Sequence, residues 1–305
     1  MSLRLVDAGA VARVPPGVIV DALDRAFHDG LADAPLRGEH AIPGGSMLLM
    51  PAADGAGSGV KVLTLEPDNP SAGLPFVQGV YVLFDDRGSP LAAVDAAALT
   101  AVRTAAVSAV AARHLAPERG GTLIVFGTGV QARSHLQTVA AELRSSRVVI
   151  CGRRPEAVAD LVAWGAVRGF AAEPGTPADV ASAGVVCTCT ASSQPLFDGA
   201  LLRPGALVIA IGAYRPDRRE LDSRTVVGST IVVEDVAAAM AEAGELAIPL
   251  AEGTLARDRV ALTLADVARG APVRDLPGRT VVFKSVGVAG EDLAAARALV
   301  AAVSG

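Results

Sequence analysis

The stretch that decides the fold reads Thr122-Leu123-Ile124-Val125-Phe126-Gly127-Thr128-Gly129-Val130-Gln131-Ala132. Its first five residues are apolar and rich in β-branched side chains, which predicts a buried parallel strand. Residues 127–132 then form the pattern G-x-G-x-x-A, after which apolar residues recur at helical spacing as far as Leu143. A second strand is predicted at Arg147-Val148-Val149-Ile150. A strand, a glycine turn, a helix and a strand within about thirty residues is the context in which this pattern indicates dinucleotide binding.

Each residue type in the turn has a physical role. Gly127 allows a tight bend, Gly129 lets the backbone approach a pyrophosphate, and Ala132 permits close packing of helix on strand. The free N–H groups and positive dipole of the helix N-terminus favour phosphate. Enzymes that use NAD place an acid after the second strand to bind the ribose hydroxyls, but this chain has Arg153 and Arg154 there. Two guanidinium groups can bind a 2′-phosphate, so the sequence predicts NADP(H) in preference to NAD(H).

The pattern of helices and strands continues through the second part of the chain. Repeated alternation of apolar strands with helices predicts a Rossmann-type doubly wound parallel sheet over residues 117–287. The further strands are expected near 167–171, 185–190, 206–211, 230–233 and 280–283. Residues 1–116 contain two β-type runs and a long helical stretch, Ala96 to Leu115, which predict an α+β domain. The last segment, 288–305, is expected to form an amphipathic helix that packs back on that first domain.

Composition excludes several classes of protein. The chain has 305 residues, of which 51% are hydrophobic, so it is expected to fold, as about two domains. A transmembrane helix is not predicted, because no uncharged apolar run reaches about 18 residues. Nucleic-acid binding is not predicted either, because the net charge is −5, aromatic residues make up 3%, and no basic block stands out. The cysteines and histidines lack the spacing of a metal site, and the first residues lack a signal-peptide pattern, so we expect a metal-free cytoplasmic protein.

The two lysines are the most informative charges in the chain. Of 27 basic residues, 25 are arginine, and the exceptions are Lys61 and Lys284. An ammonium group can lose its proton when it is buried, whereas guanidinium stays charged. Lys61 lies within the apolar run 59–63, which predicts a half-buried strand and favours a functional role. The alternative is a surface lysine with no function.

The first domain also supplies two arginines that could accompany Lys61. Arg37 and Arg103 together with Lys61 give three cations for which the sequence shows no matching acid cluster. Such a set predicts an anionic substrate, most simply a small molecule with a carboxylate. Taken singly, each arginine is also compatible with an ordinary surface charge.

At these residues the chain resembles the ornithine cyclodeaminase/mu-crystallin family. The resemblance covers about residues 35–300, and its landmarks are Met50-Pro51-Ala52, Lys61 with Pro67 and Asn69, Leu99-Thr100-x-x-Arg103-Thr104-Ala105-Ala106, the turn at 127–132, Pro204-Gly205, the segment 212–221, and Phe283-Lys284-Ser285-Val286-Gly287. It implies a homodimer built through the first domain and a nicotinamide cofactor on the second. It also implies roles for single residues: Arg37 and Lys61 bind the substrate carboxylate, Arg103 and Thr104 lie near substrate and cofactor, Val130 and Gln131 contact the pyrophosphate, Thr190 the nicotinamide ribose, and Ser285 and Val286 the nicotinamide, while Lys284 shapes the loop beside Ser285.

One departure from the family pattern bears on the reaction. Cyclodeaminases and alanine dehydrogenases of this family look to have aspartate where this chain has Tyr214, and a phenol with a pKa near 10 is a poor base for ammonia elimination. Tyr214 is therefore predicted either to donate a proton or to line the pocket. The leading expectation is NADPH-dependent reduction of a carboxylate-bearing cyclic ketimine, such as 1-pyrroline-2-carboxylate or 1-piperideine-2-carboxylate. The alternatives are an ornithine or lysine cyclodeaminase, a dehydrogenase of alanine or of N-substituted amino acids, and a non-catalytic ligand-binding protein.

Overall fold

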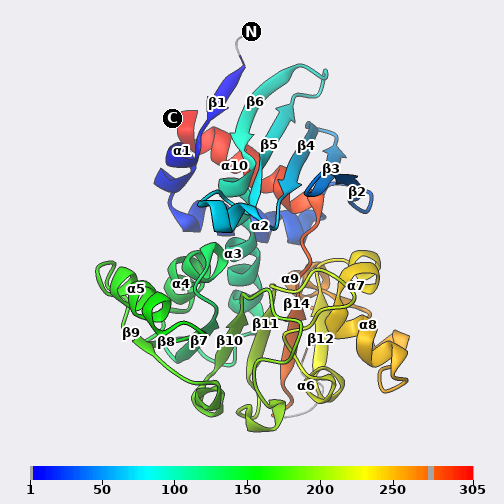
Figure 1. Cartoon of the computed structure of the whole chain (residues 1–305). Helices are drawn as coiled ribbons and strands as arrows, with labels where there is room; N and C mark the ends of the chain where they lie inside the picture. Colours follow the sequence, from blue (N-terminus) through cyan, green and yellow to red (C-terminus); the bar gives the residue numbers. More distant parts are fainter. Residues whose placement is uncertain (1–2, 274–277, 305) are drawn as a thin grey trace. The chain divides into compact units, whose positions relative to one another are not determined.

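The computed structural model describes residues 3–273 and 278–304, which form two compact units (Figure 1). The first unit comprises Met1–Arg103 with Gly287–Gly305, and the second comprises Thr104–Val286. Helix α3, Ala96–Leu115, contributes to both, so the division falls within this helix and not after it, where the sequence pattern places the boundary. All residues from 103 to 112 are buried, and a helix buried on every side carries no apolar period that would mark the change of unit. In the described residues no helix is both long and apolar enough to cross a membrane.

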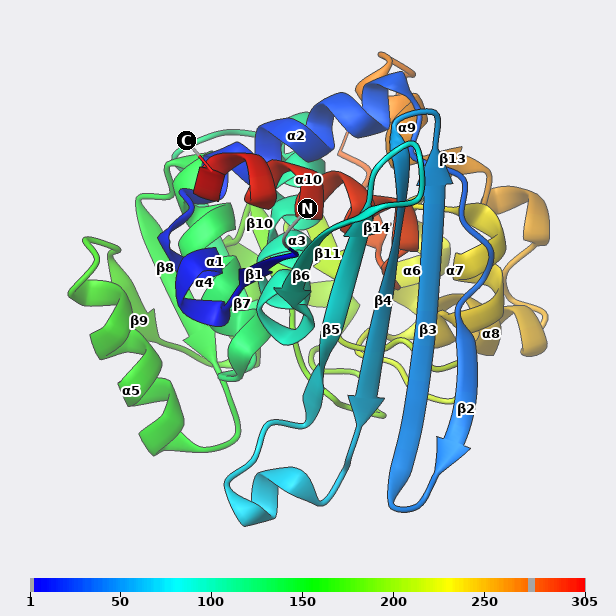
Figure 2. The ribbon, with the colours of Figure 1, turned by 90° about the horizontal axis from the view of Figure 1, so that it is seen from above.

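The first unit is built on a six-stranded sheet in the order β1-β6-β5-β4-β3-β2 (Figure 2). Strands β2 to β6 pair antiparallel, and β1 joins β6 in parallel. Strand β4 alternates between buried and half-buried residues along its whole length, as expected for a sheet with one covered face. The strands are β1 (Arg4–Val6), β2 (Gly38–Ile42), β3 (Gly45–Asp54), β4 (Gly57–Leu65), β5 (Val77–Phe84) and β6 (Pro90–Asp95).

Helix α10, Ala289–Ser304, packs against α2 and against strands β3, β4 and β5 (Figure 2). The other helices of this unit are α1 (Ala8–Arg13), α2 (Pro16–Asp29) and the 3-10 turn η1 (Asn69–Ala72). The sequence pattern predicted only β4 and β5 of this sheet. Strand β3 was missed because Gly and Pro interrupt its pattern; Pro51 lies beyond the Gly38–Leu49 pair, where β2 no longer lies beside β3 and a proline is tolerated.

The second unit contains an eight-stranded sheet in the order β13-β12-β14-β11-β10-β7-β8-β9, in which every pair is parallel. This confirms the Rossmann-type α/β fold. The weak strand expected at 167–171 lies slightly later, as β9. The strands are β7 (Thr122–Phe126), β8 (Arg147–Cys151), β9 (Ala172–Pro174), β10 (Val185–Thr188), β11 (Leu207–Ala210), β12 (Thr230–Val233), β13 (Leu262–Thr263) and β14 (Val281–Lys284).

The strand order reverses between β7 and β10, which lie side by side at the centre of the sheet. Ligands of doubly wound sheets bind at such a reversal, beyond the carboxyl ends of the strands. The connecting helices are α4 (Val130–Leu143), α5 (Pro155–Ala166), α6 (Ser223–Gly228), α7 (Val236–Glu242), α8 (Gly244–Ala251) and α9 (Leu264–Ala268), with 3-10 turns η2 (Pro177–Ser182), η3 (Gly199–Leu201) and η4 (Arg257–Arg259).

A buried hydrogen bond joins α3 to α4 inside the second unit. The Nδ1 atom of His135 lies 2.7 Å from the carbonyl oxygen of Gln131, and its Nε2 atom lies 2.8 Å from the hydroxyl of Ser108. A carbonyl only accepts, so Nδ1 carries the proton, and Nε2 accepts from Ser108. Burial lowers the pKa of His135 to about 4, so the imidazole is neutral in the folded chain at neutral pH.

This neutral histidine predicts a pH dependence of stability. Below about pH 6.5 the unfolded chain binds a proton at His135, whereas the folded chain does not until about pH 4. The free energy of unfolding therefore decreases as the pH is lowered through this window, by up to roughly 3 kcal/mol. The His135→Gln variant should lose that part of the dependence, whereas the exposed His40→Gln should keep it. Urea unfolding at pH 7, 6, 5 and 4.5 measures the free energy of unfolding at each pH. If it changes with pH equally in wild type and in His135→Gln, the prediction is contradicted.

Candidate functional site

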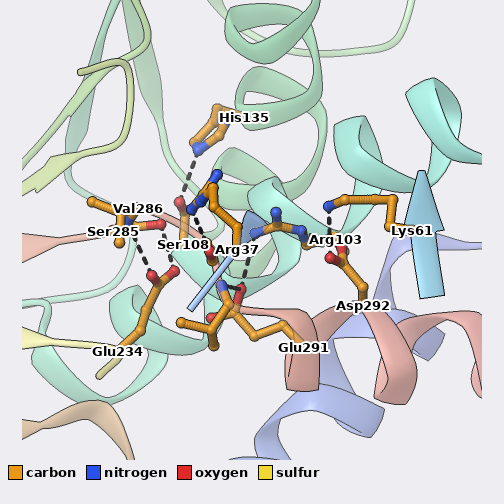
Figure 3. A network of polar contacts seen from close by, with 12 residues as sticks. Arg37, Lys61, Arg103, Ser108, His135, Glu234, Ser285, Val286, Glu291 and Asp292 are labelled. Atoms are coloured by element: carbon orange, nitrogen blue, oxygen red, sulfur yellow. Dashed lines mark hydrogen bonds and ion pairs between the residues drawn. The ribbon is translucent and has the colours of Figure 1, made fainter. Parts of the chain in front are cut away.

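Lys61 is fully buried and holds an ion pair with the first turn of α10. Its Nζ atom donates to Oδ2 of Asp292 over 2.6 Å, and the two side chains are 1% and 0% exposed (Figure 3). Strand β4 places Lys61 on the covered face of the sheet, opposite Tyr81 of β5 in the strand register. The lysine is therefore an interior residue, more deeply buried than the half-buried position that its sequence context predicts.

Arg103 completes the buried charge cluster from helix α3. Its Nε atom donates to Oδ1 of Asp292 over 2.8 Å, and its Nη1 atom donates to Oε2 of Glu291 over 2.9 Å. Its guanidinium lies against Gly287, whose φ is +80° and where a Cβ would come within 2.5 Å of Nη1 and Nη2. Arg37 donates from Nη2 to the carbonyl oxygen of the same glycine over 2.7 Å. The first unit thus brings Arg37, Lys61 and Arg103 around one end of α10.

The premise that these cations have no matching acids is wrong. Glu291 and Asp292, both completely buried, are those acids, and Asp292 contacts Lys61 as well as Arg103. An acidic pair in the first turn of a helix is common because it suits the helix dipole, so the sequence pattern alone makes them look like solvated residues. The signal that could have identified them is the position of the pair, five and six residues after Val286 in a segment that already carried site residues.

Burial and neighbouring charges act on this cluster in opposite directions. Burial lowers the pKa of Lys61 to about 8 although Asp292 raises it, and Arg103 lowers it further. Burial alone would raise the pKa of Asp292, but Arg103 and Lys61 hold it below its ordinary value. The ammonium group of Lys61 has three N–H donors. Among the described residues, its hydrogen-bond partner is Asp292, which takes one of them. Because two buried ammonium donors remain, this cluster has the chemistry to bind an anion.

In the second unit the glycine turn has the geometry of a phosphate site. Gly127 has φ +113°, and a Cβ there would lie 2.6 Å from the carbonyl oxygen of Cys189, so the turn needs glycine. Gly129 is the N-cap of α4, where no described side chain caps the helix and a Cβ would meet nothing within 4 Å. Val130, the next residue, is 68% exposed. Open space beside uncapped N–H groups fits the pyrophosphate of a dinucleotide.

Arg153 and Arg154 follow strand β8 and are exposed, with Arg154 as the N-cap of α5. Within the described part of the chain, no carboxylate forms an ion pair with either guanidinium. Gly152 beside them packs tightly, because a Cβ there would lie 2.8 Å from Val158 and 2.9 Å from Thr128. The end of β8 therefore presents two arginines and close-packed backbone where enzymes that use NAD have an acid.

Glu234, which follows strand β12, was not recognised from the sequence. Its Oε1 atom accepts from the hydroxyl of Ser285 over 2.5 Å, and its Oε2 atom accepts from the backbone N–H of Val286 over 2.9 Å (Figure 3). Glu234 is 4% exposed, so a buried carboxylate fixes both residues that follow β14. A lone acid after an apolar strand gives no distinguishing pattern, which is why it was missed.

A second buried carboxylate, Glu220, joins the ends of β10 and β11. It accepts hydrogen bonds from the hydroxyl of Thr188, from both the hydroxyl and the N–H of Thr190, and from the N–H of Gly212, all between 2.7 and 2.8 Å. Burial raises the pKa of Glu220, while Lys284 and these donors favour its charged form. Thr190 is therefore held in place at the carboxyl end of the central strands.

Lys284 has a structural partner set that the sequence did not reveal. Its Nζ atom donates to the carbonyl oxygens of Ala213 and Ala210, over 2.5 and 3.2 Å, and lies 3.2 Å from Oε2 of Glu245. These contacts hold the loop that carries the half-buried Tyr214. Lys284 thus contacts the loop that follows β11, whereas the resemblance implied a role in shaping the loop beside Ser285.

The predicted residues are divided between the two units. Arg37, Lys61 and Arg103 lie in the first unit. The second unit contains the others: Thr104, Gly127, Gly129, Val130, Gln131, Arg153, Arg154, Thr190, Tyr214, Ser285 and Val286. Across residues 3–273 and 278–304, no group of three or more His, Cys, Asp or Glu side chains is placed to hold a metal ion.

The profile of the ornithine cyclodeaminase/mu-crystallin family matches residues 17–305. The chain belongs to this family. A family member from Colwellia psychrerythraea named Delta(1)-pyrroline-2-carboxylate reductase is 35% identical over 251 residues, which are 79% of each chain.

Two solved structures share the fold of this chain over nearly their full length. The Thermococcus litoralis Delta(1)-pyrroline-2-carboxylate reductase, in complex with NADH and L-proline, matches with a TM-score of 0.92 and 27% identity over 98% of this chain and 97% of its own. An archaeal alanine dehydrogenase dimer with bound NAD matches with a TM-score of 0.92 and 26% identity over 99% and 96%. The family fold thus occurs with a nicotinamide cofactor in proteins of both names.

The glycine turn yields a prediction that separates folding from binding. Gly129→Ala should leave stability within about 0.5 kcal/mol, because its Cβ meets no protein atom, yet weaken dinucleotide binding at least about tenfold by filling the phosphate space. Gly127→Ala should instead destabilise the fold.

Thermal unfolding and calorimetric titration with NADPH measure both effects. Gly228→Ala, at another glycine with open space and no positive φ, is the control and should leave stability and affinity unchanged. Undiminished cofactor affinity in Gly129→Ala would show that the phosphates lie elsewhere.

Proposed function

We propose that this protein reduces the C=N bond of a cyclic ketimine that carries a carboxylate, of the 1-pyrroline-2-carboxylate or 1-piperideine-2-carboxylate type, with a reduced nicotinamide cofactor. The product is the corresponding cyclic amino acid. Two observations support the proposal: the likeness to relatives named Delta(1)-pyrroline-2-carboxylate reductase, and the buried Lys61 ammonium with two donors to spare. The second carries the most weight, because it is a property of this chain.

The buried cations supply the binding of substrate. Lys61 and Arg37 bind the carboxylate of the ketimine, which compensates the ammonium donors that have no partner among the described residues. A carboxylate held by two cations fixes the adjacent C=N carbon in one place, and orientation of this kind accounts for a large share of enzymatic rate gain. Arg103, locked by Glu291 and Asp292, keeps the shape of this end of α10.

The cofactor supplies the hydride when it is bound. Gly127, Gly129 and the N-terminus of α4 bind its pyrophosphate, Thr190 its ribose, and Ser285 with Val286 its nicotinamide end. Glu234 and Glu220 keep these last three residues in place. The imine nitrogen gains one proton in the reaction, from Lys61, Tyr214 or water, and the burial of Lys61 keeps bulk water away from the cluster.

A second candidate function is dehydrogenation of an acyclic amino acid. The archaeal alanine dehydrogenase matches this chain with the same TM-score as the pyrroline-2-carboxylate reductase, so the fold does not distinguish the two reactions. Both need a bound carboxylate and a nicotinamide cofactor. A panel of cyclic imines, and of pyruvate with ammonia, separates them in one assay of NADPH oxidation.

Lys61→Met tests the role of the buried ammonium. Removing one partner of a buried charge pair costs about 2–5 kcal/mol, so kcat/KM for the cyclic imine should fall by at least about thirtyfold while NADPH affinity stays within about threefold. Absorbance at 340 nm and calorimetric titration measure the two quantities.

Arg297→Met serves as the control for that experiment. It removes a cation of the first unit whose partner is Asp54 and not Asp292. Its kcat/KM should match wild type. Unimpaired turnover in a folded Lys61→Met variant would refute the assignment.

We also propose NADP(H) as the preferred cofactor, on the two exposed arginines after β8. Arg153→Ser with Arg154→Ser should raise KM for NADPH at least about tenfold, through the loss of charge-assisted hydrogen bonds to the 2′-phosphate, and change KM for NADH less than about twofold. Steady-state kinetics with both cofactors measures this, with the exposed Arg224→Ser as control. Equal losses with the two cofactors would disprove a 2′-phosphate contact.

A homodimer through the first unit completes the proposal. On β4 and β5 the residues that alternate with the buried ones are largely apolar, and they include Val60, Val62 and Val80, the last of which is 38% exposed. A second copy of the chain that covers this face would bury apolar surface that a monomer leaves in water.

A cytoplasmic location would provide NADPH. It would also keep reduced the three cysteines, which are free in the structure.

A further inference from the structure

Asp292 holds two cations at once, one with each carboxylate oxygen. Oδ2 accepts from Nζ of Lys61 over 2.6 Å and Oδ1 accepts from Nε of Arg103 over 2.8 Å. The aspartate is 0% exposed, so water does not replace either contact. A carboxylate used in this way determines the direction of the lysine Nζ, because Arg103 is itself anchored a second time, by Glu291.

The charge of Lys61 depends on the groups that surround it. Burial disfavours the ammonium form, and Arg103 and Arg37 act in the same direction. Asp292 opposes them through its charge and its hydrogen bond. Tyr81, opposite Lys61 on β5, has a pKa raised by burial and stays a neutral phenol. Among the described residues, the titratable or charged groups that act on Lys61 or lie opposite it are Asp292 from α10, Arg103 from α3, Arg37 from the segment before β2, and Tyr81 from β5, while Glu291 pairs with Arg103.

We propose that Asp292 is a positioning residue that keeps Lys61 in its ammonium form and directs its two remaining N–H groups to the substrate carboxylate. The proposal rests on the proposed function for what the ligand is, but the state of Lys61 can be measured without any ligand. Without Asp292, one negative charge is lost beside three cations in a buried cluster, and Lys61 is the cation among them that can shed its proton. A neutral amine would bind a carboxylate only weakly.

The composition of the chain makes the direct measurement simple. Lys61 and Lys284 are its two lysines, so protein labelled with 13C at the lysine ε-carbon gives two lysine signals, and the one lost in Lys61→Met identifies Lys61. In wild type the Lys61 signal should titrate near pH 8. In Asp292→Asn the midpoint should fall by at least about one pH unit, because a charged partner within hydrogen-bond distance is removed.

Asp54→Asn is the matched control, because it removes an acid that pairs with α10 through Arg297 but does not contact Lys61. Its Lys61 midpoint should stay at the wild-type value. An unchanged midpoint in folded Asp292→Asn, or a wild-type Lys61 that is already neutral at pH 7, would overturn the proposal.

The kinetic readout tests the consequence for the reaction. Wild-type kcat/KM for the cyclic imine should decline above about pH 8 as Lys61 loses its proton, and in Asp292→Asn this decline should begin at lower pH by the same shift as the NMR midpoint. Asp292→Glu keeps the negative charge and should restore part of the profile. A uniform loss of activity with no displacement of the pH profile would indicate a purely structural role and contradict the proposal.

The two measurements also separate this proposal from the proposed function. If no imine is reduced and the Lys61 midpoint still moves in Asp292→Asn, the substrate assignment fails and the positioning role stands. If the imine is reduced and the midpoint does not move, the reverse holds. Should Asp292→Asn not fold, the wild-type titration and the Asp292→Glu variant decide, since Lys61 must then be charged at pH 7 in both.

Discussion

The contact between Asp292 and its two cations, Lys61 and Arg103, is the interaction on which the rest of the buried cluster depends. Buried ion pairs of this kind add little net stability, because the loss of hydration offsets much of the attraction, while removing one partner is strongly destabilising. Once one charge of the cluster is buried, the others are required. This requirement accounts for the two acids in the first turn of α10, Glu291 and Asp292, which pair with the buried cations. It also accounts for Gly287, because a side chain there would collide with the Arg103 guanidinium. A cluster that gives little stability is more readily explained by binding than by folding.

The two units contribute different chemistry. The first unit offers buried cations held by buried acids, which suits recognition of a carboxylate, and the second offers an uncapped helix N-terminus and hydroxyl groups held by buried acids, which suits a dinucleotide. In both, a buried glutamate or aspartate orients a group that we propose to contact the ligand: Asp292 bonds to Lys61, and Glu234 bonds to Ser285 and the N–H of Val286. Neither Asp292 nor Glu234 lies in the segments on which the resemblance to the family was recognised in this sequence.

The sequence predicted the parts of the molecule that local patterns encode. The parallel strands of the second unit, the glycine turn and the helix Ala96–Leu115 follow from apolar runs, glycine spacing and length, and the structure confirms them. The scarcity of lysine drew attention to Lys61, which the structure shows buried and paired, yet no local pattern reveals that its partner is residue 292, because that contact joins segments 231 residues apart. Glu234 and Asp292 were missed for the same reason: an isolated acid has meaning only once its burial and its hydrogen-bond donors are known. Strand β3 was missed because a proline is unusual inside a strand. The sheet accepts Pro51 because β2 no longer pairs with β3 at that position.

The measurement that tests the central claim most directly is a crystal structure of the chain with NADP+ and a cyclic amino acid such as L-proline bound together. We expect the carboxylate of the amino acid to lie within hydrogen-bond distance of Nζ of Lys61 and of the Arg37 guanidinium, with Lys61 still bonded to Asp292. A carboxylate bound away from Lys61, or an Asp292 side chain turned from Lys61 in the complex, would contradict it.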